Sequence, residues 1–166
     1  MTRRRAVLLG LVGLIALAAV GLRVLVAEPF RIPSESMRPT LRAGDSVLVE
    51  KLAHSVHRGD LVVFRRPGDG EILLKRAVAV AGDTVAIEDG ALYVDGRRRH
   101  EPYADPRAID SVYFGPVRVP AGTLFALGDN RADSLDSRQF GAVPVRRVIG
   151  RVVARIWPPE RWGAAG

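Results

Sequence analysis

A serine and a lysine, Ser36 and Lys75, stand in sequence settings that could make them a catalytic pair. Ser36 lies between two prolines that restrict the backbone on either side of it. Lys75 lies in the apolar run 72–80, and the only other lysine among the 25 Lys plus Arg residues is Lys51. Arginine keeps its proton at working pH, whereas burial can lower the pKa of a lysine until the amine is neutral. A neutral Lys75 could be the base that makes Ser36 a nucleophile.

Strand geometry would place these side chains usefully. In a strand, Lys75 shares a face with the apolar Leu73, and Arg76 points to the opposite face. Apolar neighbours disfavour an ammonium ion. If the backbone around Ser36 is extended, the hydroxyl of Ser34 lies on the same face and could stabilise an oxyanion with the Ser36 N–H. Taken alone, the two stretches are also typical of an edge-strand lysine and of a serine-proline turn.

A third polar stretch, GDNRADSLDSRQFG at residues 128–141, combines hydroxyl, carboxylate and guanidinium groups. Its alternating charges predict a loop held by ion pairs, with Asp136 paired to Arg138 or to Arg76. Asp129 and Asp136 also raise a metal site as an alternative, but the arginines in the same stretch disfavour a bound cation.

Together these stretches resemble the bacterial type I signal peptidases, which are Ser/Lys proteases. PSESMRPTL at 33–41 matches the nucleophile box P-S-x-S-M-x-P-T-L, and KRAVAVAGD at 75–83 matches the lysine box. Residues 128–141 match the box G-D-N-R-x-x-S-x-D-S-R-x-x-G, and GDLVVF at 59–64 matches a shorter hydrophobic box. One box alone would be a weak signal, whereas four boxes in the order of the family are very specific.

The resemblance implies a role for each polar residue of the boxes. Ser36 would be the nucleophile and Lys75 the general base. Ser34 and the Ser36 N–H would form the oxyanion hole, and the Ser134 hydroxyl would orient the lysine amine. The site would be held by a scaffold of Arg76, Asp129, Asn130, Arg131, Asp136 and Arg138. The implied reaction is removal of signal peptides from secretory preproteins after small-x-small sites, through an acyl-enzyme and with no cofactor or metal.

Other functions remain open at this stage. A Ser/His/Asp triad would need one of His54, His57 or His100, but none lies in a matched box and we expect all three on the surface. A peptidase with one dedicated substrate, such as a pilin, would share the same site. A self-cleaving Ser/Lys repressor would need a DNA-binding N-terminus. A membrane-anchored module without activity would not be expected to keep all three residues of the site.

Glu35 and Arg38 occupy positions that the nucleophile box leaves open. We hypothesise that the charge of Glu35, next to the nucleophile, alters substrate preference. A Glu35→Gly variant with unchanged preference across a panel of cleavage sites would exclude this.

The N-terminus predicts a membrane anchor. Arginines at positions 3–5 precede an apolar run over 6–27 that only Arg23 interrupts. About 20 apolar residues in a helix cross a bilayer, and the arginine cluster should stay in the cytoplasm. We therefore expect residues 1–27 to be a cytoplasmic tip and single transmembrane helix, and 28–166 to be a domain on the outer face of the cytoplasmic membrane. A cleaved signal peptide is the alternative, with Ala16-Leu-Ala18 as a possible site, but the apolar run is longer than usual for one.

The remainder predicts a mostly β fold, a compact antiparallel sheet or barrel-like catalytic domain. Glycine, proline and aspartate separate strand-length apolar runs. The runs are 46–49, 61–64, 72–80, 84–87, 91–94, 124–127 and 148–157. Asp89-Gly90 between two of them predicts a tight hairpin. The region of about 96–120, rich in proline, is expected to be a loop, and the family resemblance implies that it is a short variable insertion.

Composition narrows the class of partner. A hydrophobic fraction of 48% excludes a disordered chain, and the absence of cysteine excludes disulfides and thiolate metal sites. The net charge of +7 suits anionic lipid headgroups, although solvated arginines would give the same value. The predicted membrane span argues against nucleic acid as a partner. We expect a monomer whose partners are preproteins and the lipid bilayer.

Overall fold

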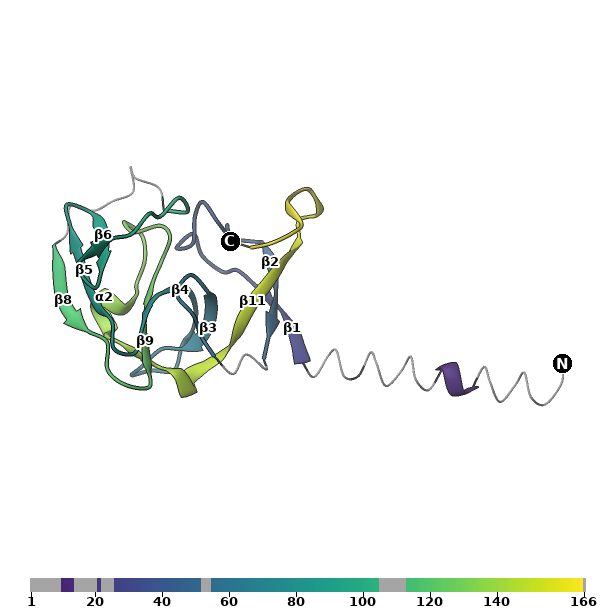
Figure 1. The fold of residues 1–166 in the computed structure, drawn as a ribbon. Coiled ribbons are helices and arrows are strands. Elements are labelled where there is room, and N and C mark those ends of the chain that lie inside the picture. The colour runs from purple at the N-terminus through teal and green to yellow at the C-terminus, as the bar shows by residue number, and fades with distance from the viewer. Residues whose placement is uncertain (1–9, 14–20, 22–25, 52–54, 105–112, 166) are drawn as a thin grey trace.

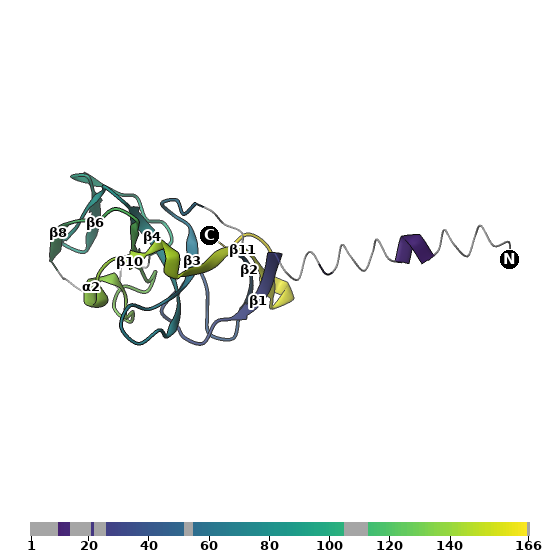
Figure 2. The same cartoon turned by 90° about the horizontal axis from the view of Figure 1, so that it is seen from below.

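The computed structural model describes residues 10–13, 21, 26–51, 55–104 and 113–165. They form two antiparallel sheets (Figures 1 and 2). The larger sheet has the strand order β1-β2-β11-β3-β4-β9-β10. Its strands are β1 (Ala27–Arg31), β2 (Ser46–Glu50), β3 (Leu61–Arg65), β4 (Ile72–Val80), β9 (Thr123–Leu127), β10 (Val143–Pro144) and β11 (Val148–Trp157). The smaller sheet has the order β7-β6-β5-β8, with β5 (Thr84–Glu88), β6 (Ala91–Val94), β7 (Arg97–Arg98) and β8 (Phe114–Arg118). Short helices are α2 (Ser137–Phe140), η2 (Val145–Arg147) and η3 (Pro159–Arg161).

The strands that the apolar runs predict are all present, within one residue at each end. They are β2, β3, β4, β5, β6, β9 and β11. The hairpin between β5 and β6 also forms at the predicted place, with Glu88 opposite Ala91. Asp89 and Gly90 both have positive φ, 48° and 73°, which is the backbone of the tight turn that matches strand twist.

None of the four edge strands, β1, β10, β7 and β8, was expected from the sequence. β1 begins at Ala27 and contains Pro29, and β8 contains Pro116 within the region predicted to be a loop. Each lies at the end of its sheet, where the missing N–H of proline need not break a ladder. Gly115 has φ +81°, and a Cβ there would lie 2.5 Å from the carbonyl oxygen of Val85. The predicted insertion is therefore partly sheet, and its residues 105–112 lie outside the described residues.

The larger sheet is open. Its end strands, β1 and β10, do not pair with each other in the part of the chain that is described, so barrel-like closure is not formed. The sheet ends at β1 on one side of the molecule, and the smaller sheet lies at the other end (Figures 1 and 2). Strands β4 and β9 pack against the smaller sheet, because Val78 and Phe125 from these strands share a buried cluster with Val85 and Leu92 of that sheet.

The predicted membrane span falls largely outside the described residues. Within residues 1–27, positions 10–13, 21, 26 and 27 alone are described. No helix among the described residues of the chain has both the length and the apolar character needed to cross a membrane.

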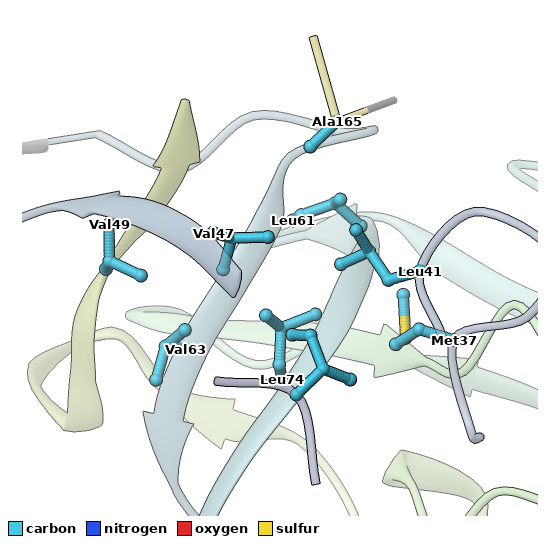
Figure 3. Close-up of a cluster of buried hydrophobic side chains, with 9 residues drawn as sticks. Met37, Leu41, Val47, Val49, Leu61, Val63, Leu74 and Ala165 are labelled. Atoms are coloured by element: carbon cyan, nitrogen blue, oxygen red, sulfur yellow. The ribbon is translucent and has the colours of Figure 1, made fainter. Parts of the chain in front are cut away.

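One buried cluster fixes the position of the serine segment. Met37 and Leu41, from segment 33–41, pack against Val47, Leu61 and Leu74 of three strands (Figure 3). Met37 and Leu41 are fully buried. Burial of side chains of this size stabilises a fold by about 1.5–3 kcal/mol each, so these two residues hold the segment against β4.

Candidate active site

Ser36 and Lys75 meet inside the protein although 39 residues separate them. The Lys75 Nζ donates a hydrogen bond to the Ser36 Oγ at 2.6 Å. Lys75 is 3% exposed and Ser36 is 8% exposed. The segment around Ser36 is a turn, closed by the Arg38 N–H bonding to the Glu35 carbonyl, so the extended backbone considered from the sequence is wrong. The turn still brings the Ser34 Oγ to 3.2 Å from the Ser36 Oγ.

Burial inside the protein lowers the pKa of Lys75, so that part of the amine is neutral near pH 7 and able to accept a proton. Strand β4 pairs with β3 on one side and β9 on the other, and positions 74–79 are all buried. Burial lowers the pKa of Lys75 to about 8, while the carboxylates of Asp136 and Asp129 act in the opposite direction. This pKa agrees with the expectation from the apolar strand. Roughly one lysine in ten is then neutral at pH 7.

A buried ion pair joins all four sequence motifs. Arg76 grips Asp129 through two hydrogen bonds, of 2.9 Å and 2.8 Å. The Arg76 Nη1 also donates to the Gly59 carbonyl at 2.9 Å, and the Thr40 hydroxyl donates to Asp129 at 2.5 Å. Asp129 is fully buried. Thr40, Gly59, Arg76 and Asp129 come from the four different boxes, so this network holds the boxes together.

The loop 128–141 is held by a second ion pair. Asp136 pairs with Arg138, which is one of the two pairings that the sequence predicts, while Arg76 takes Asp129 instead. Asp136 also caps helix α2 and accepts the Gly128 N–H at 3.0 Å. The carboxylates of Asp129 and Asp136, which raised a metal site as an alternative, are thus engaged by guanidinium groups.

Asn130, Gly128 and Arg131 connect this loop to the serine turn. The Asn130 N–H donates to the Ser36 carbonyl at 3.1 Å, and its side chain donates to the Glu35 carbonyl at 3.3 Å. A Cβ at Gly128 would lie 2.7 Å from the Ser36 carbonyl oxygen and would also collide with the Ser134 side chain. The Arg131 Nε donates to the Gly128 carbonyl at 3.0 Å. The loop therefore approaches Ser36 closely enough to require glycine at position 128.

Ser134 lies in the site but does not make the predicted contact. Its Oγ is buried and has no hydrogen-bond partner among the described residues. The hydrogen bond between Ser134 and Lys75 is therefore not formed, and the described contact of the Lys75 amine is the one to the Ser36 Oγ. Leaving a buried hydroxyl without a partner costs about 1–3 kcal/mol of stability. Such unpartnered hydroxyls are uncommon, and one often marks a functional site.

The alternative bases lie elsewhere. His57 and His100 are exposed, as expected, and His54 lies outside the described residues. Lys51, the second lysine, is exposed and pairs with Glu28 on the surface at 2.5 Å.

Sequence reasoning missed the pocket beside the pair. A cavity of about 180 Å³ opens next to Ser36 and Lys75. Its apolar lining comes from Ile32, Met37, Ile72, Leu73 and Leu74, with Glu71 also on the wall. The lining residues flank Ser34, Ser36 and Lys75 in the sequence, and this proximity is the one feature that could have predicted the pocket.

This arrangement places a serine hydroxyl, a lysine amine with a lowered pKa and a small apolar pocket together. The model of the family described as "Signal peptidase, peptidase S26" matches residues 4–157. The chain belongs to the signal peptidase family, S26. As a member of that family it is a serine peptidase, and therefore a hydrolase. The resemblance seen in the four boxes is confirmed.

Relatives in the signal peptidase family span most of the chain. A signal peptidase I of Leptolyngbya laminosa is 38% identical over 166 residues, covering 93% of this chain and 81% of the relative. A signal peptidase I of Mycobacterium tuberculosis is 36% identical over 198 residues, covering 83% of this chain and 67% of the relative. The crystal structure of a signal peptidase I from Enterococcus faecalis superimposes with a TM-score of 0.52 at 31% identity, covering 58% of this chain and 96% of that one.

Proposed function

We propose that this peptidase removes signal peptides from exported preproteins with Ser36 and Lys75 as its catalytic dyad. The observation that carries the proposal is the 2.6 Å contact between the Lys75 Nζ and the Ser36 Oγ, made by a lysine whose pKa is lowered to about 8. A general base must lie within hydrogen-bond reach of the proton that it removes, and this one does.

The reaction follows from the geometry. Neutral Lys75 takes the hydroxyl proton of Ser36, and the Oγ attacks the carbonyl carbon of the scissile bond. The Ser34 hydroxyl and the Ser36 N–H stabilise the oxyanion of the tetrahedral intermediate. The intermediate collapses to an ester on Ser36, and Lys75 returns its proton to the departing amine. Lys75 then deprotonates a water molecule that attacks the ester, which releases the signal peptide and regenerates Ser36.

The pocket supports a preference for small residues. Its volume is about 180 Å³, which suits a single side chain of the substrate. The side chain before the scissile bond would enter this pocket, whose apolar lining includes Met37 and Leu73. Cleavage after small-x-small sites is the specificity that the family resemblance implies.

We further propose that residues 1–27 anchor the enzyme in the cytoplasmic membrane, with the domain on the outer face. The support is the apolar run itself and the arginine cluster before it. A preprotein whose signal helix lies in the same bilayer would then meet Ser36 at a high effective concentration.

The test is cleavage of a preprotein with an Ala-x-Ala site by the detergent-solubilised chain. We expect the wild type to cut at that bond, and Ser36→Ala and Lys75→Ala to lose at least about 1,000-fold in rate, since removing a member of a catalytic pair costs on this order. Ser55→Ala and Lys51→Ala are matched controls, because both residues are exposed, and should keep the wild-type rate.

Two outcomes would contradict the proposal. Cleavage that survives in Lys75→Ala would exclude Lys75 as the base and would indicate that a histidine acts as the base instead. A wild type that cuts no general preprotein would favour a dedicated substrate or a module without activity.

A further inference from the structure

A second cavity, of about 690 Å³, lies against the smaller sheet. Its lining consists of residues 90–92 at the start of β6, residues 98–102, Ala104 and Arg131, and it shares no lining residue with the pocket beside Ser36. Strand β6 lies at the end of the molecule far from β1 (Figure 1). The volume falls within the range of small-molecule sites. The cavity therefore has the size of a binding site and is separate from the proposed dyad.

The charge of the lining is positive. Glu101 is the one carboxylate on the described wall, and both of its oxygens are occupied. Arg131 donates to the Glu101 Oε2 at 2.9 Å, and the Tyr103 hydroxyl donates to the Oε1 at 2.9 Å. Glu101 thus neutralises Arg131. Arg98 and Arg99 are left without a counter-ion on the wall of the cavity.

Arg99 has an unused donor. Its Nε is buried and has no hydrogen-bond partner among the described residues. The charge of Arg99 acts on Asp83. The pKa of Asp83 is lowered chiefly by a hydrogen bond from Arg58 and to a smaller extent by the charge of Arg99. The Asp83 oxygens are taken by Arg58 and by the Val80 N–H. A buried N–H without an acceptor is rare, so a ligand is the natural source of one for Arg99.

We propose that this cavity binds a small molecule carrying a phosphate-class oxyanion, held by Arg98 and Arg99. Guanidinium groups match phosphate oxygens in charge and in geometry, and bind them through paired hydrogen bonds. Leu92, Pro102 and Ala104 on the same wall would contact an apolar part of the ligand. The site is additional to peptide hydrolysis and does not depend on the dyad.

Calorimetric titration of the full chain in a non-ionic detergent at low salt tests the proposal, with inorganic pyrophosphate as the probe. We expect saturable binding to the wild type, weakened at least tenfold in Arg99→Gln and in Arg98→Gln. Arg97→Gln is the matched control. Arg97 neighbours Arg98 on β7, points to the opposite face and is not part of the lining, so its removal should change the affinity less than twofold.

The outcomes separate clearly. Equal weakening in Arg97→Gln and Arg99→Gln would show general attraction to a basic protein and would overturn the proposed site. The site would also be overturned if the wild type bound neither pyrophosphate nor the short-chain lipid described below. A thermal melt checks the fold of each variant, and the exposed Arg98 decides the question if Arg99→Gln does not fold.

A second probe distinguishes the source of the phosphate. Dihexanoyl phosphatidylglycerol, a soluble short-chain lipid, is titrated beside pyrophosphate. Stronger binding of the lipid that is lost in Arg99→Gln assigns the site to a lipid headgroup. Stronger binding of pyrophosphate with the same loss assigns it to a soluble phosphate compound.

Discussion

Lys75 is subject to two opposing electrostatic effects. Burial disfavours its ammonium form, and the nearby carboxylates of Asp136 and Asp129 favour it. Burial is the larger effect and leaves the pKa at about 8. Because the carboxylates are themselves engaged by arginines, they offset only part of the cost of burial. At the scale of the residue, the strand environment therefore decides what fraction of the Lys75 amine is neutral.

The pH dependence of activity follows from this pKa. If Lys75 is the base, as proposed, it must be neutral, so kcat/KM for a short peptide should rise about tenfold per pH unit below pH 8 and level off above it. Initial rates between pH 5 and pH 10 measure the profile. A limb centred near 6.5, the usual pKa of histidine, would instead indicate an imidazole base.

The same pKa predicts a change in stability. Below pH 8 the lysine is protonated in both the folded and unfolded chain, and the cost of its burial is complete. Between about 8 and 10.5 the unfolded chain keeps the proton that the folded chain has lost, so stability rises with pH. A lowered pKa of this size costs about 3 kcal/mol of folding free energy, at about 1.36 kcal/mol per unit. Replacing Lys75 would remove this cost, but it would also remove the hydrogen bond to Ser36, which stabilises the fold by about 1 kcal/mol.

Lys75→Met should consequently be more stable than the wild type by about 2 kcal/mol at pH 7. The gain should shrink as the pH approaches 10.5. Urea unfolding at several pH values measures it. Lys51→Met, at an exposed position, should show no comparable change with pH, and a destabilised Lys75→Met at pH 7 would contradict the account.

At the scale of the elements, the Arg76–Asp129 pair joins strand β4 to the loop after β9. Asp129→Asn should lower the free energy of unfolding by about 3–5 kcal/mol, because it leaves a buried guanidinium without its counter-charge. Urea unfolding is the measurement. Glu50→Gln is the control: its pair with Arg151 is about one-third exposed, and the loss should stay below about 1 kcal/mol. Similar losses in both variants would mean that the buried pair is not a main support of the site.

At the scale of the whole molecule, the N-terminal segment and the domain should contribute separately to catalysis. Deleting residues 1–25 preserves β1 and the Val26 carbonyl, which accepts the Lys51 N–H at 2.8 Å. We expect hydrolysis of a short soluble peptide to change less than about twofold, since the dyad is untouched. Cleavage of a preprotein held in lipid vesicles should fall about 100-fold or more, because co-localisation is lost. Equal effects on the two substrates would contradict a role in tethering.

Local patterns allowed much of this protein to be predicted. Apolar runs bounded by turn residues indicated β2 to β6, β9 and β11, and Asp89-Gly90 indicated the hairpin between β5 and β6. These features could be predicted because apolar alternation and turn formation depend on residues that are neighbours in the sequence. The edge strands β1 and β8 escaped prediction because proline in a run argues against a strand unless its place at the edge is known. The pocket walls escaped for a similar reason, since a pocket exists only once separate segments pack.

The amino-acid sequence by itself determined which residue types were available for chemistry, the motifs that contain them and most of the strands. Tertiary structure alone decided that Lys75 reaches Ser36 across 39 residues, that Arg76 selects Asp129 across 53, and that Thr40 joins them across 89. It also left Ser134 without the predicted partner. The physical reason is distance along the chain: local propensities set the backbone of each strand and turn, whereas contacts between remote residues depend on how the buried surfaces of both sheets pack.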